Sequence, residues 1–239
     1  MREPNERIVL VTGANRGIGR AIARRFVAAG DTVVATVRGA GGERELREAW
    51  AGEVGSRLVV ERCDVRDAAQ VEGLAERVRA RLGRVDVLVN NAAVFEERDA
   101  ALRADELDPE LVRRTLDVNV VGMVTVCVAL VPLVPRGGRV VNLSSDLGQF
   151  GKPGGMTATM VAYSLSKAAV NAYTSALANA LRARGILVDS LHPGWVRTAM
   201  GGPNAPLAPA DGAEAVYRLA TRAAGESGRF WRDGAPAAW

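Results

Sequence analysis

Short apolar segments alternate with amphipathic segments along almost the whole chain, and this alternation limits the possible folds more than any other feature. The apolar segments lie at Ile8–Thr12, Thr32–Val37, Leu58–Cys63, Val85–Asn90, Arg139–Leu143, Ile186–Leu191 and Arg229–Trp231. The segments between and after them that are long enough for helices are Ile18–Ala29, Gly42–Ala51, Ala68–Leu82, Pro109–Leu130, Ala162–Arg184 and Pro209–Ala223. Short continuous apolar runs are typical of strands covered by helices on both faces. We therefore predict a doubly wound α/β fold around a parallel sheet, the Rossmann architecture.

The composition fits one large domain with a substantial core. The chain has 239 residues, of which 48% are hydrophobic, and its sequence shows no internal repeat, low-complexity stretch or linker. A chain of this size and apolar content can bury one continuous core, so we expect a single domain over residues 1–239. The formal net charge is +4, with acidic and basic residues interspersed and no basic run. Nucleic-acid binding is therefore not expected.

Neither a targeting segment nor a membrane span is expected. Met1–Arg7 is polar and leads directly into the first apolar segment, whereas a signal peptide needs an apolar core there. The longest apolar run, Val120–Pro135, is interrupted by Gly122 and Pro132 and falls short of the roughly 20 residues that cross a bilayer. These observations predict a soluble, cytoplasmic protein without a membrane partner.

The cysteines and the histidine do not form a recognisable site. Cys63 ends a predicted strand and Cys127 lies in an apolar stretch, so we expect both to be buried and reduced. With one histidine, His192, and two separated cysteines, no metal site is expected. A hydrolase that uses Ser145, His192 and Asp189 is an alternative, but no Gly-x-Ser-x-Gly motif surrounds the serine.

A glycine-rich turn follows the first predicted strand. Gly13, Gly17 and Gly19 form the pattern Gly-x3-Gly-x-Gly where the chain enters a helix. Glycine lets the backbone turn tightly and lets a pyrophosphate approach the helix N-terminus without meeting a Cβ atom. A tight strand–helix turn alone would also favour glycine, but at the first βα turn of this fold the pattern indicates a dinucleotide site. The other residues of this turn that we expect to contact the cofactor are Asn15, Arg16 and Ile18.

The end of the second predicted strand indicates the type of dinucleotide. NAD sites place a carboxylate there, about 20 residues after the glycines, to hold the ribose 2′-hydroxyl. Val33–Arg38 contains no carboxylate, and Arg38 together with Arg16 could instead clamp a 2′-phosphate through bidentate hydrogen bonds. The alternative is that both arginines are solvated surface residues. We predict NADP(H) as the cofactor.

Tyr163 and Lys167 are four residues apart on a predicted helix, so they lie on one face about one turn apart. A free tyrosine has a pKa near ~10, and a nearby ammonium would lower that pKa toward the range in which the phenol exchanges protons. Ser145, after the fifth predicted strand, could donate a hydrogen bond to a carbonyl oxygen as negative charge builds on it. These three side chains predict proton transfer to or from a substrate oxygen.

Together these residues make the chain similar to the short-chain dehydrogenase/reductase family over essentially all of its length. The landmarks that match in order and near the family's spacing are Thr12-Gly13-x3-Gly17-x-Gly19, Cys63-Asp64-Val65, Asn90-Asn91-Ala92-Ala93, Asn119, Ser145, Tyr163 with Lys167, and Pro193-Gly194. His192–Thr198 and Val34–Arg38 resemble the NADPH-dependent carbonyl reductases more than the acyl-carrier-protein reductases. Ala93 departs from the family, which usually has glycine there, and Ser145 and Tyr163 are a few residues further apart than usual.

The resemblance implies a role for each catalytic residue. Tyr163 is the general acid in reduction and the base in oxidation. Lys167 lowers the pKa of the tyrosine and holds the nicotinamide ribose. Ser145 steadies the substrate oxygen, and Asn119 holds a water that relays protons behind the lysine. The implied cofactor contacts, besides Tyr163 and Lys167, are Asp64 and Val65 at the adenine, Asn91 and Ala92 on the adenosine side, and Pro193, Gly194, Val196 and Thr198 at the nicotinamide.

These expectations combine into one main function and two alternatives. The main function is an NADP(H)-dependent oxidoreductase that transfers hydride between the nicotinamide and a ketone, an aldehyde or a secondary alcohol. The alternatives are an alcohol or hydroxysteroid-type dehydrogenase working in the oxidative direction, and a non-catalytic nucleotide sensor of the same fold. We expect a small-molecule substrate in an apolar pocket shaped by loops 94–107, 146–161 and 199–208. A homodimer or homotetramer is also expected.

Overall fold

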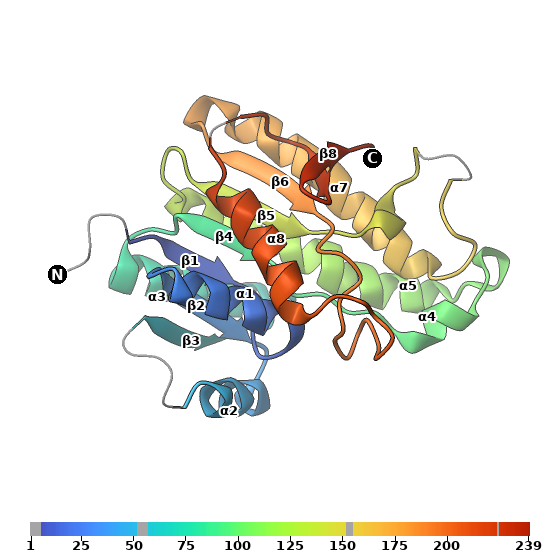
Figure 1. The fold of residues 1–239 in the computed structure, drawn as a ribbon, viewed down its shortest axis with the longest axis horizontal. Coiled ribbons are helices and arrows are strands. Elements are labelled where there is room, and N and C mark those ends of the chain that lie inside the picture. The colour runs from blue at the N-terminus through green and yellow to red at the C-terminus, as the bar shows by residue number, and fades with distance from the viewer. Residues whose placement is uncertain (1–5, 52–56, 152–154, 224) are drawn as a thin grey trace.

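One eight-stranded sheet forms the centre of the molecule, seen in a computed structural model that describes residues 6–51, 57–151, 155–223 and 225–239 (Figure 1). The strand order is β3-β2-β1-β4-β5-β6-β7-β8. The strands are β1 (Ile8–Val11), β2 (Thr32–Val37), β3 (Leu58–Arg62), β4 (Val87–Asn90), β5 (Arg139–Leu143), β6 (Leu187–Leu191), β7 (Phe230–Arg232) and β8 (Ala235–Ala237). Within the described residues, every neighbouring pair is parallel except β7 and β8. The predicted Rossmann architecture is confirmed.

Helices cover both faces of the sheet (Figure 1). One face carries α1 (Gly17–Ala28), α2 (Ala40–Ala49) and α8 (Pro209–Thr221), and the other carries α3 (Ala68–Leu82), α5 (Pro109–Leu116), α6 (Met123–Leu130) and α7 (Val161–Leu181). Successive strand residues point to opposite faces. Ile8 and Leu10 therefore join the core of α3, α6 and α7, while Val9 and Val11 join the core of α1 and α8. Burial on both faces is the reason that the strands are continuous apolar runs.

The strand order reverses between β1 and β4, which are neighbours in the sheet although β2 and β3 separate them in sequence. Open α/β sheets bind ligands in the crevice at the carboxyl ends of the strands at such a reversal. Polar residues stand at these ends: Thr12 follows β1, Asn90 ends β4, and Ser144 and Ser145 follow β5. The topology thus gathers the predicted cofactor and catalytic residues at one edge of the sheet.

The helices α5 and α6 are parts of one continuous helix, Pro109–Leu133. A π-helical turn at Asp117–Gly122 (η2) joins them, and a 3-10 turn at Val131–Leu133 (η3) ends the helix. The helix predicted over Pro109–Leu130 is confirmed and continues through Gly122, where a Cβ would lie 2.7 Å from Val65 Cγ2, so this position favours glycine for close packing. By length and composition alone this helix could cross a membrane, with a mean hydropathy of 2.1. It packs against α3 and α7, and core helices of globular proteins meet the same criterion.

Two elements are absent from the sequence prediction. The strand β8 pairs antiparallel with β7 through a turn in which Asp233 and Gly234 have φ of 51° and 81°. The short helix α4 (Glu97–Ala101) lies in the loop after β4.

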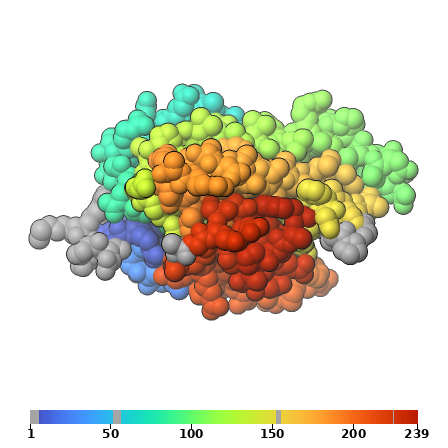
Figure 2. Space-filling model, turned by 90° about the horizontal axis from the view of Figure 1, so that it is seen from above, coloured from blue at the N-terminus to red at the C-terminus, as the bar shows by residue number. Residues whose placement is uncertain are grey.

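After β8, the carbonyl oxygen of Trp239 accepts a hydrogen bond from Gly151 N at 2.8 Å, so this end of the chain (red in Figure 2) lies against the loop after β5 (yellow). Three further 3-10 turns are Ala104–Glu106 (η1), Asp146–Gly148 (η4) and Arg182–Arg184 (η5).

Candidate active site

The turn between β1 and α1 needs its glycines for different reasons. Gly13 and Gly17 have φ of +65° and +57°, in the left-handed region that side chains disfavour. Gly19 is required by packing, because a Cβ there would lie 2.4 Å from both Asn91 Nδ2 and the carbonyl oxygen of Gly13. A Cβ at Gly17 would lie 3.3 Å from Thr198 Cγ2. The loop after β6 therefore reaches the same turn.

Hydrogen bonds join the two strand ends at the switch point. Thr12 Oγ1 accepts from the main-chain N–H groups of Asn91 and Ala92, each at 3.0 Å. Asn91 Nδ2 donates to the carbonyl oxygens of Thr12 and Gly13 at 2.7 and 3.0 Å. The side chain that the sequence places on the adenosine side of the cofactor thus also holds the glycine turn in position.

The N-terminus of α1 suits an anion. Its N-cap residue, Arg16, makes no capping hydrogen bond through its side chain, and the first turn carries no acidic residue. Unsatisfied N–H groups and the positive end of the helix dipole bind phosphate when the backbone can be approached closely. With Gly13 and Gly17 beside it, this terminus fits the pyrophosphate of the predicted dinucleotide.

Two arginines stand where a 2′-phosphate is expected. Arg16 and Arg38 are exposed, and in the described part of the chain neither guanidinium is engaged in a hydrogen bond or an ion pair. Asp64, expected at the adenine, is held by Arg66 at 2.7 Å. The hydrogen bond from Arg66 keeps the pKa of the Asp64 carboxyl below its usual range, with a smaller contribution from the charge of Arg38. Asp64 therefore stays ionised at this end of the crevice.

Three of the predicted cofactor residues also make contacts within the protein. Asn15 Nδ2 donates to Glu45 Oε2 at 3.0 Å, which joins the glycine turn to α2. Ile18 packs against the core of α1 and α8. Val65 is buried beneath the long helix, where it meets Gly122. These three side chains are therefore held by contacts within the protein itself.

Tyr163 and Lys167 lie on one face of α7, as predicted, with Lys167 Nζ 5.3 Å from the centroid of the Tyr163 ring. Nζ donates to the carbonyl oxygen of Leu143, the last residue of β5, at 2.9 Å. Burial lowers the pKa of Lys167 to about 8. Burial raises the pKa of Tyr163 above its usual range, and the charge of Asp146 raises it further. The expected lowering of the tyrosine pKa by the lysine is therefore not found, and the phenol is protonated at neutral pH.

Ser145 is 7% exposed and forms the turn after β5. Its Oγ donates to Asp146 Oδ1 at 3.2 Å and accepts from Leu147 N at 3.1 Å. Ser144, as expected, bonds to the backbone: its Oγ donates to the carbonyl oxygen of Lys167 at 3.3 Å. The two serines thus differ in role, since the first ties β5 to α7 and the second stands at the strand end.

Asn119 lies in the π-helical turn and is 2% exposed. Its Oδ1 accepts from Val94 N at 2.8 Å, and its Nδ2 donates to Val94 O and to Ser166 Oγ, both at 3.0 Å. Ser166 in turn donates to the carbonyl oxygen of Tyr163 at 2.7 Å. The side chain therefore joins the long helix, the segment after β4 and α7.

The loop after β6 faces the glycine turn across the crevice. Gly194 has φ of +87°, and a Cβ there would lie 2.3 Å from Leu207 Cδ1. Val196 is buried and forms an isolated β-bridge with the same leucine, which holds the loop closed on itself. The predicted nicotinamide contacts on this loop are Pro193, Gly194, Val196 and Thr198.

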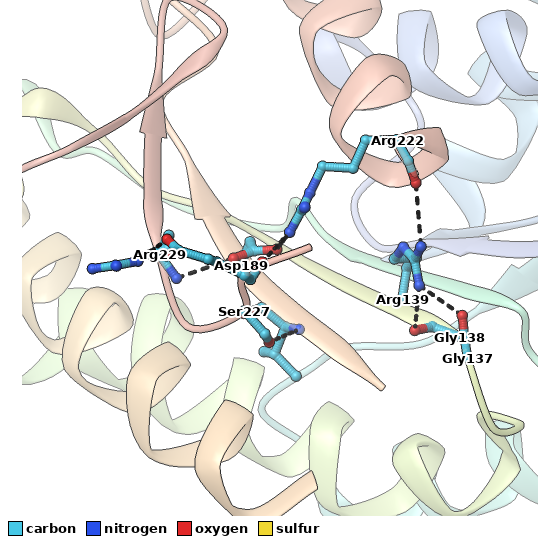
Figure 3. A network of polar contacts seen from close by, with 9 residues as sticks. Gly137, Gly138, Arg139, Asp189, Arg222, Ser227 and Arg229 are labelled. Atoms are coloured by element: carbon cyan, nitrogen blue, oxygen red, sulfur yellow. Dashed lines mark hydrogen bonds and ion pairs between the residues drawn. The ribbon is translucent and has the colours of Figure 1, made fainter. Parts of the chain in front are cut away.

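In the described part of the chain, Ser145, His192 and Asp189 are not joined by hydrogen bonds of the kind that a hydrolase triad needs. His192 Nδ1 lies 3.9 Å from Asp146 Oδ1. Asp189 instead accepts from Arg222 at 2.9 Å and from Arg229 N at 3.0 Å, as Figure 3 shows, and so anchors the end of α8 to β6. In the described residues, no group of three or more His, Cys, Asp and Glu side chains is placed to hold a metal ion.

The carboxyl edge of the sheet at the switch point therefore combines a glycine turn, an uncapped helix N-terminus and a tyrosine–lysine pair at the end of β5, the strand that precedes Ser145. A family model described as short chain dehydrogenase matches residues 7–206. The chain belongs to the short-chain dehydrogenase family. The resemblance expected from the motifs is confirmed, and with it the class of this protein as an oxidoreductase.

This short-chain dehydrogenase is similar to several carbonyl reductases. Carbonyl reductase 1 (NADPH) of Sus scrofa is 32% identical over 282 aligned positions, which cover 98% of this chain and 95% of that protein. The structure of carbonyl reductase Sniffer of D. melanogaster has 27% identity and a TM-score of 0.87, with 98% of this chain and 100% of that chain covered. The NADPH-bound carbonyl reductase from chicken fatty liver has 26% identity and a TM-score of 0.85, with both chains covered completely.

Two acidic residues near Tyr163 have no signal in the sequence. Asp146 raises the pKa of the tyrosine and accepts from Ser145, but it lies in a segment that looks irregular. Asp99 accepts from the main chain of Tyr163, 64 residues away in sequence. Neither position repeats a motif or a helical period, so only the folded chain shows their closeness to the site.

Proposed function

We propose that this short-chain dehydrogenase is an NADP(H)-dependent reductase that transfers hydride between the nicotinamide and a ketone or aldehyde, reversibly with the secondary alcohol. The observation that carries the proposal is the hydrogen bond from Lys167 Nζ to the carbonyl oxygen of Leu143, which places the face of α7 that carries Tyr163 and Lys167 at the end of β5, two residues before Ser145. The similarity to carbonyl reductases supports the substrate class. The exposed Arg16 and Arg38, and NADPH in a similar structure, support the cofactor.

The cofactor would lie along the crevice with its pyrophosphate at the N-terminus of α1. Arg16 and Arg38 would hold the 2′-phosphate through charge-assisted hydrogen bonds. Thr198 faces the glycine turn and would hold the nicotinamide end. When bound, the nicotinamide supplies or accepts the hydride.

The proton chemistry favours reduction. Burial and the charge of Asp146 raise the pKa of Tyr163, so the phenol keeps its proton and can donate it to a carbonyl oxygen. Ser145 would donate a second hydrogen bond to that oxygen as negative charge develops on it. In the oxidative direction Tyr163 must first lose its proton, and the same two effects oppose that loss. These two effects keep Tyr163 in the protonated form that reduction requires.

An apolar substrate suits the exposed side chains of the surrounding loops. Phe150 follows β5 and is 57% exposed, while Trp195 and Met200 follow β6 and are 56% and 45% exposed. Trp195 Nε1 donates to the carbonyl oxygen of Gly201 at 2.8 Å, so the indole is fixed on its own loop. Apolar groups exposed on adjacent loops above a crevice commonly mark a ligand site. We propose that these three side chains line the entrance for an apolar carbonyl compound.

A second copy of this chain is proposed to cover the outer face of the long helix. Val121 and Val128 lie one heptad apart and are 54% and 69% exposed, and Leu165 on α7 is 40% exposed. An apolar patch of this kind becomes buried when a twofold axis places it against itself. Light scattering should give a dimer or tetramer for the wild type and a smaller species for Val128→Glu. A monomeric wild type would refute this part of the proposal.

Cofactor titration and a carbonyl panel test the function. Purified protein is titrated with NADPH and NADH and then assayed for NADPH loss with ketones, aldehydes and quinones. Tyr163→Phe should lower kcat by about 100- to 10,000-fold and change the NADPH Kd far less, because it removes the proton donor and only one of many cofactor contacts. Tyr173→Phe, half-buried on the same helix, is the matched control and should keep its rate. Tight NADPH binding without turnover on any substrate would favour the sensor.

A further inference from the structure

The helix α7 begins without a cap from its own sequence. Met160, at the N-cap position, has φ of +57° and makes no side-chain hydrogen bond to the first turn. N-cap positions favour Ser, Thr, Asp or Asn, whose side chains accept from the N–H groups of the first turn. A left-handed methionine offers no such acceptor. The N–H groups of this buried turn need an acceptor from elsewhere in the fold.

Asp99 supplies that acceptor from α4. Its Oδ1 accepts from Ala162 N at 3.1 Å, and its Oδ2 accepts from Tyr163 N at 2.9 Å. The residue is 1% exposed. Within the part of the chain that the structure describes, the carboxylate has no ion pair with a lysine or arginine. Polar oxygens that are buried this completely need hydrogen-bond donors, and the N–H groups at the start of α7 supply them.

The segment that carries Asp99 is itself fixed at two points. At its start, Val94 is held by Asn119 through two hydrogen bonds. Further on, the carbonyl oxygen of Asp99 accepts from Met160 N at 3.0 Å. Figure 1 shows α4 beside the chain that leads into α7, and Figure 2 shows the same neighbours in green and yellow. The carboxylate is therefore presented to α7 from a rigid support.

We propose that Asp99 is a positioning residue for Tyr163, fixing the first turn of α7 and hence the phenol against the segment after β4. Phe95, from the same segment, packs edge-on against the Tyr163 ring with the centroids 5.5 Å apart. Asp99 thus locates the tyrosine through its main chain and Phe95 through its ring. The inference rests on the proposed catalytic role of Tyr163.

Variants of Asp99 are compared with a cap at another helix. Asp67 caps α3 in a similar way, since its Oδ1 accepts from Gln70 N at 3.1 Å, and Asp67→Ala is the matched control. Misplacing a reacting group by about 1 Å costs on the order of 100-fold in rate. We therefore expect Asp99→Asn and Asp99→Ala to lower kcat by about 10- to 100-fold, with KM and the NADPH Kd changed by less than about threefold. Asp67→Ala should lose similar thermal stability and keep kcat within about twofold.

A second readout separates the cap from the reaction. Amide hydrogen exchange at Ala162 and Tyr163 should be faster in both Asp99 variants and unchanged in Asp67→Ala. Asp99→Glu, which keeps the carboxylate, should recover part of both the protection and the rate. If Asp99→Ala does not fold, Asp99→Asn carries the test, because it keeps the shape and one acceptor oxygen.

Three results would overturn the proposal: unchanged kcat in the Asp99 variants well below their Tm, equal loss of kcat in Asp67→Ala, or unchanged exchange at the start of α7. A wild type that reduces no carbonyl compound would instead contradict the proposed function. The exchange measurement would still decide whether Asp99 holds the first turn of α7.

Discussion

Lys167 Nζ donates to the carbonyl oxygen of Leu143 at 2.9 Å, and this hydrogen bond ties α7 to the end of the central strand β5. Lys167 is 3% exposed, so its ammonium group has little contact with water. It is therefore held at a fixed distance from Tyr163 at a cost in stability. Buried charged groups that lower the stability of the fold are common at functional sites.

Lys167→Met should remove activity and yet stabilise the fold near neutral pH. The folded-state pKa of about 8 lies below the ordinary value of 10.5, so the unfolded state binds more protons between these pH values. The unfavourable contribution of the lysine is therefore complete below about pH 8 and disappears as the pH rises past 10.5. Thermal unfolding of both proteins across this range should show a gain in Tm at neutral pH that shrinks toward alkaline pH.

Lys167→Arg is the comparison for that experiment. A guanidinium stays charged over the whole range, so this variant should be less stable than the wild type and the deficit should grow with pH. A Tm for Lys167→Met that is lower than the wild type at neutral pH would contradict the assignment of a strained, buried ammonium.

Asp146→Asn should make alcohol oxidation easier. The charge of Asp146 raises the pKa of Tyr163, so removing it lowers that pKa and shifts the alkaline limb of the oxidation rate to lower pH. The asparagine keeps an oxygen that can accept from Ser145 Oγ, so the turn after β5 should remain intact. The pH profile of alcohol oxidation is the measurement, and Asp233→Asn, an equal charge change on an exposed turn, should leave it in place. If the alkaline limb of the alcohol-oxidation profile of Asp146→Asn stays in place or moves to higher pH, the charge of Asp146 does not raise the pKa of Tyr163.

Arg38→Ser should weaken the preference for the phosphorylated dinucleotide. Losing charge-assisted hydrogen bonds to a 2′-phosphate costs about 1.5–3 kcal/mol, or roughly 10- to 100-fold in affinity. The Kd of NADPH should rise by that factor while the Kd of NADH hardly changes. Arg81→Ser on α3 removes the same charge from an exposed position and should affect neither. Equal weakening of both cofactors by Arg38→Ser would contradict a specific 2′-phosphate contact.

Gly19→Ala should damage the cofactor site through packing alone. Its Cβ would come within 2.4 Å of Asn91 Nδ2 and the Gly13 carbonyl oxygen, so α1 or the end of β4 must move. Overpacking of this kind costs about 1–3 kcal/mol, seen as a lower free energy of unfolding together with weaker NADPH binding. Gly41→Ala in α2 meets no atom within 4 Å and should be neutral or slightly stabilising. Normal NADPH binding by a folded Gly19→Ala protein would show that the turn tolerates the shift.

The sequence alone determined the features that are set by neighbouring residues. Apolar runs and helical periods depend on local spacing, so the order of strands and helices could be predicted, and Thr32–Val37, Arg139–Leu143 and Ala68–Leu82 have the predicted bounds. The glycine turn also depends on local φ angles. The four-residue spacing of Tyr163 and Lys167 fixes their common face on any helix. These signals were sufficient to place the chain in its family.

Only the tertiary structure decided how the site is held and charged. Asp99 accepts hydrogen bonds from the start of α7, although it lies on a helix too short to show a helical period in the sequence. The side chain of Asn119 forms hydrogen bonds with Val94 and Ser166. The pKa of Tyr163 rises instead of falling because the phenol is buried and the charge of Asp146 adds to that effect, and burial is a property of the packed fold. Contacts between residues far apart in sequence leave no local pattern. The motifs therefore name the groups that we propose to react, and the fold sets the positions of these groups and the shifts of their pKa values.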